Sequence, residues 1–372
     1  MQRMLTVLAL IGTTTFAAAE DSGPDTDPNN GLTVSQISLG DQIGYNEIIR
    51  SSTSILNGHN SNRVEDVFVT IGDGDITYSF TPAGAVDQSI LNAVNLLLSS
   101  DTVIENAEQT MLGTQSARNL VAAGAYYNQI SVDQTGENLA NIIVAEQVNS
   151  VRQAFGPGAT QEVYNELSGA AAGISGVTQI GRNTANVVLA KVSIGSGEQL
   201  FPADTTQMID NLVALDKGTR LPAGIVQSGT NIGNVLIADD VRDVVRIFNG
   251  DQIVRNTVTA LDGNTPRGVT QSGLNIANFV SAKTVEGLTQ VSDGRQIVEN
   301  SIEGVTLADM SGRVRGYSYS STNIVNLLDI RSSDTPSVGT TINAVQTANQ
   351  PQRVQSDSGS HTQVGNVSMI TR

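Results

Sequence analysis

One short pattern, Gln-x-Gly-x-Asn-x-x-Asn, recurs along this 372-residue chain at nearly constant spacing. Complete copies begin at Gln134, Gln179, Gln227 and Gln271, and weaker copies begin at Gln42, Gln88, Tyr319 and Gln363. The first residues of successive copies lie 44–48 residues apart. Self-similarity at a fixed period is the signature of repeat architectures, in which each unit packs mainly against its neighbours. The sequence therefore predicts a stacked repeat protein.

A second, weaker pattern lies between these copies and consists of a Gln and an Asn four residues apart. It occurs at Gln115 and Asn119, Gln161 and Asn165, Gln207 and Asn211, Gln252 and Asn256, and Gln296 and Asn300. Its Gln-to-Asn spacing equals that of the stronger pattern. Each unit is therefore interpreted as two half-repeats of about 23 residues, one strong and one weak.

Alternation of side chains predicts strands for both halves. In the strong half, every second residue from Val177 to Val187 is apolar, Gly, or the repeated Gln or Asn. This period of two is that of a strand with one buried face. A helix remains the alternative for the weak halves, because residues four apart share a helical face and Thr114, Thr160 and Thr206 stand where an N-cap would. The β-branched content favours strands there too.

These elements predict an all-β fold, a β-solenoid of stacked strand-turn-strand repeats. The turns are assigned to the motif glycines Gly136, Gly181, Gly229 and Gly273, since Gly tolerates tight corners. With one half-repeat per rung and ~4.8 Å between rungs, about sixteen rungs would form a rod of roughly 75 Å.

The repeated Gln and Asn side chains are predicted to point inward. A buried amide without partners costs about 1–3 kcal/mol, but amides stacked one per rung donate to one neighbour and accept from the other. A one-residue slip would break every pair, so such a ladder also fixes the register. The predicted ladder comprises Gln42, Asn46, Gln88, Asn92, Gln134, Asn138, Gln179, Asn183, Gln227, Asn231, Gln271, Asn275 and Asn323 in the strong halves, and Gln115, Asn119, Gln161, Asn165, Gln207, Asn211, Gln252, Asn256, Gln296 and Asn300 in the weak halves.

The N-terminus predicts export. Arg3, the apolar run Leu5–Ile11 and the small residues before Glu20 form a secretory signal over residues 1–19. The chain has no Cys, so neither disulfides nor thiolate chemistry are expected. Residues 20–33 are expected to be a disordered leader, residues 34–331 the repeat domain, and residues 332–372 a weak terminal repeat or cap.

Composition and charge limit the kinds of molecule that this chain is expected to bind. A formal charge of −16 argues against nucleic acid and anionic lipid, which need Lys and Arg contacts. The absence of Trp and an aromatic content of 4% suit a thin core repeated along one axis. No transmembrane segment is expected, because the apolar run of the signal is too short to span a bilayer. Self-association is the expected partnership.

One segment departs from the repeat. Val67–Val69 and Ile76–Phe80 flank a Gly- and Asp-rich stretch, which predicts a β-hairpin. A calcium site at Asp73 and Asp75 is the alternative to a plain turn there. No cofactor or metal site is predicted elsewhere.

The alternation Val-x-Gln-x-Gly-x-Asn-x-Ala-x-Val, carried by Val177–Val187 and nearly repeated by Val269–Phe279, resembles the curlin repeat of curli fibre subunits. The resemblance implies export beyond an outer membrane, inward Gln and Asn ladders, assembly into extracellular amyloid fibres of a biofilm, and outer-membrane secretion and nucleation partners. It covers most of the chain after the signal and is strongest from Val132 to Val280. The chain departs from the curlin pattern in its Gly-x-Asn spacing and in alternating strong and weak halves.

Two other functions stay open beside this structural one. A monomeric surface adhesin of the same fold would bind glycan through an outward face. A β-helix polysaccharide-degrading enzyme would need paired carboxylates, yet the repeats mark no such pair. His59 and His361 are the only histidines and stand at opposite ends, so no Ser-His-Asp set is predicted. We expect a non-enzymatic protein without catalytic residues.

Overall fold

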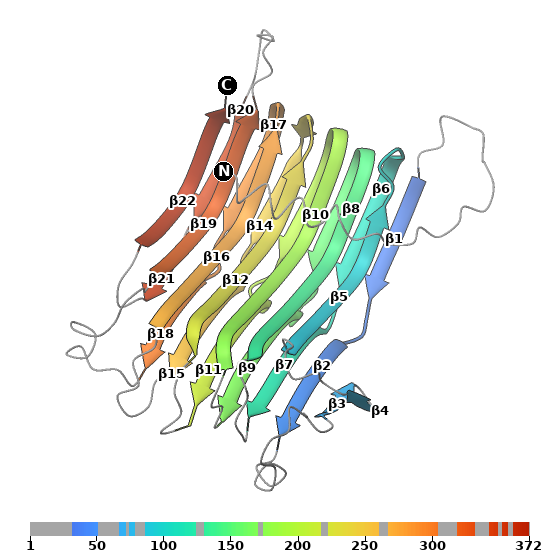
Figure 1. Cartoon of the computed structure of the whole chain (residues 1–372). Helices are drawn as coiled ribbons and strands as arrows, with labels where there is room; N and C mark the ends of the chain where they lie inside the picture. The colour runs from blue at the N-terminus through green and yellow to red at the C-terminus, as the bar shows by residue number, and fades with distance from the viewer. Residues whose placement is uncertain are drawn as a thin grey trace, which may run out of the picture.

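A computed structural model describes residues 32–50, 67–71, 74–78, 86–123, 130–169, 174–216, 222–259, 267–303, 318–331, 342–348, 352–355 and 360–371. Every regular element within these residues is a β-strand, so the all-β prediction is confirmed and the helical alternative for the weak halves is wrong. The strands stack side by side as parallel neighbours (Figure 1), an arrangement compatible with the predicted β-solenoid.

The stacked strands fall into three rows, which we name from their sequence. The motif row carries the Gln-x-Gly-x-Asn pattern, the facing row carries the weak pattern, and the connecting row lies between them along the chain. One segment of each row, taken in chain order, makes one coil of the structure.

The motif row contains β5 (Val86–Leu98), the first parts of β8 (Ile130–Phe155) and β10 (Ile174–Phe201), β12 (Ala223–Ile237), β16 (Arg267–Ala282), β19 (Ser318–Arg331) and β22 (Ser360–Thr371). The connecting row contains β1 (Leu32–Ser38), β6 (Val103–Met111), the second parts of β8 and β10, β13 (Asp240–Arg242) with β14 (Val244–Phe248), β17 (Thr284–Ser292) and β20 (Ile342–Ala348). The facing row contains β2 (Gln42–Arg50), β7 (Thr114–Ala123), β9 (Thr160–Gly169), β11 (Thr206–Leu215), β15 (Asp251–Thr259), β18 (Gln296–Glu303) and β21 (Gln352–Gln355).

In the interior of the stack, paired residues lie 44–48 residues apart, so the whole unit stacks rather than the half-repeat. Gln134 pairs with Gln179 in the motif row, and Gln161 pairs with Gln207 in the facing row. Strong halves therefore stack on strong halves and weak on weak, while the two kinds face each other across the core. The stack is seven strands deep instead of sixteen, which gives roughly 34 Å at ~4.8 Å per strand rather than 75 Å.

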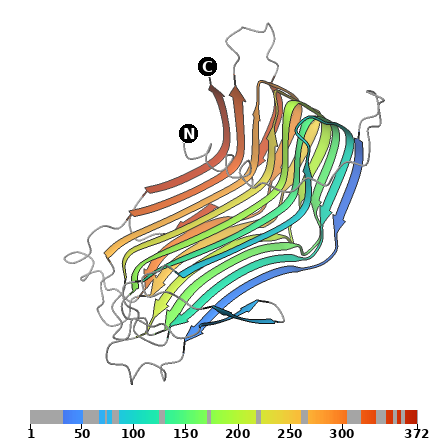
Figure 2. The same ribbon diagram turned by 45° about the vertical axis from the view of Figure 1, so that its right-hand side comes forward.

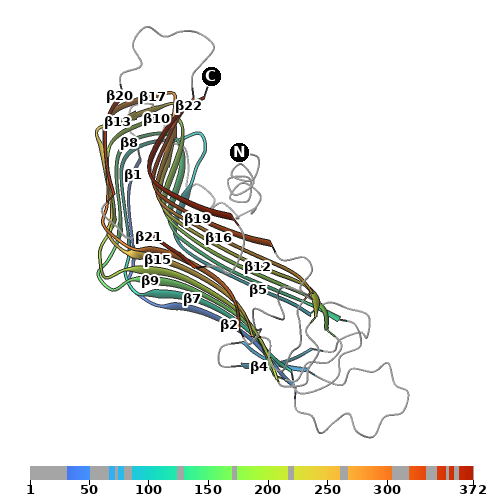
Figure 3. The same ribbon diagram turned by 90° about the vertical axis from the view of Figure 1, so that its left-hand side faces the viewer.

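The cross-section is a narrow two-layered sheet with a bend (Figures 2 and 3). The first part of each motif-row strand packs against the facing row, and the part beyond the bend packs against the connecting row. The bend falls at the second Asn of the motif, where Asn95, Asn141 and Asn186 have φ of 52°, 55° and 50°. Asn tolerates this left-handed region better than most side chains, which explains its use at this point.

The core is a series of thin apolar layers separated by the amides. Phe155, Phe201 and Phe248 stack at the end of the connecting row, with successive ring centroids 4.5 Å apart. Val163, Ile209, Val254 and Val298 form another layer in the facing row. Each layer repeats along the stack, so the chain buries its apolar side chains with few aromatic residues.

The motif glycines lie inside strands, so their assignment to turns is wrong. Gly136, Gly181, Gly229 and Gly273 belong to β8, β10, β12 and β16. A Cβ on Gly181 would lie 2.4 Å from Cγ2 of Ile209, and one on Gly273 would lie 2.2 Å from Cγ1 of Val298. Glycine is needed because the facing row approaches closely at this point, not because the chain turns.

Several other predictions can be placed on the structure. β1 begins at Leu32, two residues before the predicted start of the repeat domain. β3 (Val67–Ile71) and β4 (Gly74–Tyr78) form the predicted antiparallel hairpin. β20, β21 and β22 continue the three rows, as a weak terminal repeat would. The predicted signal, residues 1–19, and Asp73 of the calcium alternative lie outside the described residues.

Candidate functional site: the amide columns and the ends of the stack

The motif-row Gln side chains form a hydrogen-bonded column through the core. Nε2 donates to Oε1 of the preceding Gln at 2.8–2.9 Å from Gln271 through Gln227, Gln179 and Gln134 to Gln88. Gln179 Nε2 also donates to the carbonyl oxygens of Asn165 and Leu212, both at 2.9 Å, across the core in the facing row. Each interior amide thus holds its two neighbours and the opposite layer together.

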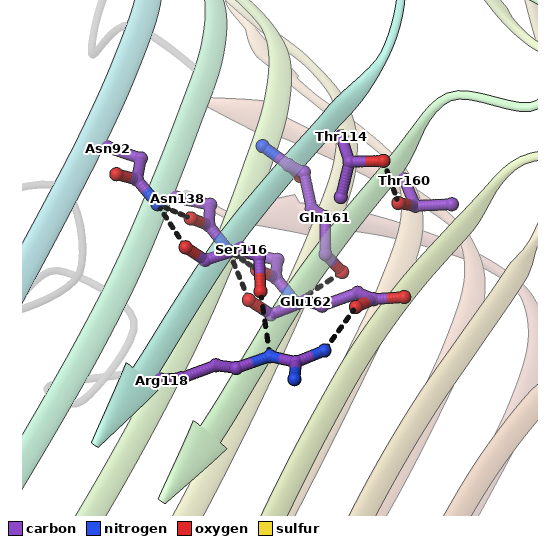
Figure 4. Close-up of polar contacts among 9 residues, drawn as sticks. Asn92, Thr114, Ser116, Arg118, Asn138, Thr160, Gln161 and Glu162 are labelled. Carbon is purple, nitrogen blue, oxygen red and sulfur yellow. Dashed lines mark hydrogen bonds and ion pairs between the residues drawn. The ribbon is translucent and has the colours of Figure 1, made fainter. Parts of the chain in front are cut away.

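The motif-row Asn side chains form a second column, in which each amide is again hydrogen-bonded to the amides above and below it. Nδ2 donates to the next Oδ1 at 2.9 Å from Asn92 through Asn138, Asn183, Asn231 and Asn275 to Asn323. Asn92 also donates to the carbonyl of Ser116 and Asn138 to that of Glu162, as Figure 4 shows. These cross-layer bonds explain how a buried amide is satisfied without water.

The facing row carries two further columns, built from the predicted weak-half residues. Its Gln column runs through Gln296, Gln252, Gln207, Gln161, Gln115 and Gln42, and its Asn column through Asn46, Asn119, Asn165, Asn211, Asn256 and Asn300. Gln42 and Asn46 were assigned to the strong pattern, but they pair with Gln115 and Asn119 and belong to the facing row. Gln363, taken as a first motif residue, pairs with Asn323 and holds the motif Asn position.

Two columns were missed by the sequence analysis. The second motif Asn stacks at the bend through Asn95, Asn141, Asn186, Asn234, Asn278 and Asn326. The connecting row holds a Gln column through Gln36, Gln109, Gln153 and Gln199. The signal was present in the sequence, because Gln109, Gln153, Gln199 and Gln290 recur at the same period as the motif.

The columns are polar along the stack, and the two amide types run in opposite directions. Every Gln column donates toward the N-terminal end, as in the bond from Gln179 to Gln134. Every Asn column donates toward the C-terminal end, as in the bond from Asn138 to Asn183. The two ends of the stack therefore present different hydrogen-bonding groups, and the stack has a direction.

One charged side chain interrupts this pattern. Arg246 occupies the connecting-row Gln position between Gln199 and Gln290 and is fully buried. Its Nε donates to Gln199 Oε1 at 2.8 Å and its Nη2 donates to the carbonyl of Asn234, while Nη1 has no partner among the described residues. Burial lowers the pKa of this guanidinium well below its usual value. Because a guanidinium cannot accept a hydrogen bond, the column cannot continue from Gln290 through Arg246.

The outer faces carry salt bridges between neighbouring coils. Arg152 lies between Glu108 and Glu198, at 2.8 and 3.4 Å, and Lys283 contacts Asp239 at 2.7 Å. Arg118 reaches Glu162 at 4.0 Å (Figure 4). Its guanidinium also lies over the ring of Tyr164, 4.8 Å from the ring centroid. These exposed pairs contribute little to stability individually, but they match charges between adjacent coils.

The N-terminal end of the stack exposes apolar side chains beside strands with open edges. β1, β2 and β5 each pair with one described strand of their own row, and the β3–β4 hairpin lies beside β2 (Figure 1). Leu32, Ile37, Leu39, Ile43, Leu91 and Leu98 in or next to these strands are all more than 40% exposed. An open edge with exposed apolar side chains is a template for further strand pairing.

Within the described residues, no group of three or more His, Cys, Asp or Glu side chains is placed to hold a metal ion. Among the described residues there is no helix long and apolar enough to cross a membrane. No protein-family model, curated protein or solved structure matches this chain.

Proposed function

We propose that the chain is a secreted, curlin-like structural subunit, a β-solenoid that assembles end to end into extracellular fibres. The observation that supports this best is the combination of polar amide columns with open strand edges at the N-terminal end. The facing-row Gln column runs from Gln42 to Gln296, and its register continues to Gln352 in the last strand of that row. Such a column has no structural reason to stop at one chain. A second copy would offer the next amide and cover the exposed apolar side chains.

The proposed role is mechanical, in a surface matrix or biofilm, and needs no catalytic residue or cofactor. Parallel stacking satisfies the backbone and the amides together, which gives fibres of this kind their resistance to unfolding. The charge of −16 would slow association and leave the isolated chain soluble until ends meet in register. Secretion and nucleation partners at the outer membrane belong to the same proposal.

Assembly of the purified chain tests this proposal. Dilution from denaturant should give thioflavin-positive fibres in electron micrographs after a lag that seeds shorten. Ile37→Lys with Ile43→Lys should slow growth, because both side chains lie at the open N-terminal end with exposed fractions of 56% and 68%. Val226→Lys with Val245→Lys is the matched control, since these exposed side chains lie in the middle of the stack.

A chain that stays a soluble β-rich monomer under all conditions would contradict the fibre proposal. That outcome would favour the monomeric adhesin, whose outward face would then be screened against glycans. Equal slowing by the terminal pair and the control pair would show that added charge, rather than the end of the stack, controls growth.

A further inference from the structure

The three rows do not begin and end at the same level of the stack. At the N-terminal end, β1 and β2 form the outermost level of the connecting and facing rows, and the motif row begins one level later with β5. At the C-terminal end, β22 extends the motif row one level beyond β20 and β21. Each end therefore carries part of a coil.

The two partial coils are complementary. Each row contains seven strand segments within the described residues, counting β13 and β14 as one. The N-terminal partial coil has a connecting and a facing strand but no described motif strand at its level. The C-terminal partial coil has only a motif strand. Together they contain one strand of each row, which is one whole coil.

We propose that two copies of this chain join by completing this split coil between them, β22 of one copy with β1 and β2 of the next. This inference rests on the proposed end-to-end assembly and specifies its junction. β22 would pair along the open edge of β5 in the next copy, β20 would pair with β1, and β21 with β2. The two partial coils would fit together, so the edges of β1 and β5 are covered in one step, while β21 would approach β2 beside the β3–β4 hairpin.

The register of each row determines which positions meet. Following each row from end to end places Gln36 at the register position next to Gln346, and Gln42 next to Gln352. In the motif row, Asn92 would neighbour Gln363 and Asn95 would neighbour Asn366. Amide residues thus hold both sides of the junction in four columns, although the terminal copies of the motif are the weakest in sequence.

The polarity of the columns permits this junction and disfavours the alternatives. Gln36 is the last donor of its column among the described residues, accepting from Gln109 and donating to the carbonyl of Leu96. Two N-terminal ends facing each other would bring Nε2 donors of the same columns together. A C-terminal end facing an N-terminal end instead continues the direction of every column, so copies join head to tail and the assembly stays open.

Cysteine pairs can test the junction directly, since the chain contains no Cys. Leu91 and position 362 hold the same register column at opposite ends of the motif row. Across the proposed junction they would be neighbours ~4.8 Å apart, within the Cα range of a disulfide. We would mix a Leu91→Cys chain with a differently tagged Thr362→Cys chain and oxidise during assembly. An Asp87→Cys chain replaces Leu91→Cys as the control, four residues out of register and ~13 Å away.

The expected result is the mixed 91–362 disulfide at about tenfold or more over the 87–362 control, without 91–91 homodimers. Fibres that form without the mixed disulfide, or with 91–91 disulfides, would overturn the split-coil junction and leave the fibre proposal standing. Mixed disulfides in dimers that never extend to fibres would support the junction and contradict the fibre. Neither fibres nor disulfides would overturn both.

Discussion

Gln179 lies 45 residues after Gln134 in the sequence, yet its Nε2 donates to Gln134 Oε1 at 2.9 Å, and both side chains are fully buried. The same Gln-to-Gln bond recurs in three of the six columns, one in each row, and fixes the register of the strands that it joins. The stability of the chain should therefore depend on the amides far more than on the exposed salt bridges.

Gln179→Ala should destabilise the chain by about 3 kcal/mol or more. The substitution removes the donor to Gln134 Oε1 and to the carbonyls of Asn165 and Leu212, and each unsatisfied buried group costs about 1–3 kcal/mol. Urea unfolding followed by circular dichroism measures the change. Thr178→Ala, at the neighbouring half-buried position of the same strand, should change the free energy of unfolding by much less.

Gly181→Ala should destabilise the chain by about 1–3 kcal/mol through overpacking, because its Cβ would lie 2.4 Å from Ile209 Cγ2. Ile209→Ala removes that methyl group and should relieve much of the cost. The double variant would then be more stable than the sum of the single effects predicts. Strict additivity in this double-mutant cycle would contradict the close approach of the two rows.

Arg246→Gln should stabilise the chain by about 1–3 kcal/mol. The replacement restores an amide to the connecting-row column and removes a buried guanidinium that lacks a carboxylate partner among the described residues. Arg246→Leu removes the charge but leaves Gln199 Oε1 without its donor, so it should gain less. A lower urea midpoint for Arg246→Gln than for the parent chain would count against this account of the position.

Mild acid should stabilise the chain through two carboxyl groups. Burial raises the pKa of Glu137 above 4.5 and that of Asp210 above 3.8. The folded chain therefore holds these protons more tightly than the unfolded chain. Stability from them is complete below the ordinary pKa values and is lost as the pH rises through the raised ones.

The measurement is the urea midpoint as the pH is lowered from neutral toward the ordinary pKa range of a carboxyl group. Glu137→Gln combined with Asp210→Asn should flatten the dependence in this range. A parent chain and a double variant with the same slope would show that other groups control the response.

The sequence predicted the strands and the amides well because both depend on local alternation. The period of two from Val177 to Val187 identifies a buried face without knowing what covers it. The role of Gly181 could not be predicted, since it depends on Ile209 in a strand that the pattern does not place opposite it. Gln42 was assigned to the wrong row because it precedes Gln88 by one period, while the structure pairs it with Gln115, 73 residues later.

The connecting row was missed for a different reason. Its segments vary in length and continuity, from the second part of β10 to the separate strands β13 and β14. Few residues in it repeat clearly: the Gln at positions 109, 153, 199 and 290, and the Phe at positions 155, 201 and 248. When each unit is divided into two halves, the connecting row falls in the loops between them. Each half then counts as a separate level, so the predicted stack is about twice as long as the observed one.

Helical reconstruction of assembled fibres by electron cryomicroscopy tests the central claim most directly. If copies continue one stack, strands should be spaced ~4.8 Å along the fibre axis throughout, and each chain should advance the axis by seven levels, about 34 Å. Strands that do not lie across the fibre axis, or a chain that remains monomeric under every assembly condition, would contradict the account.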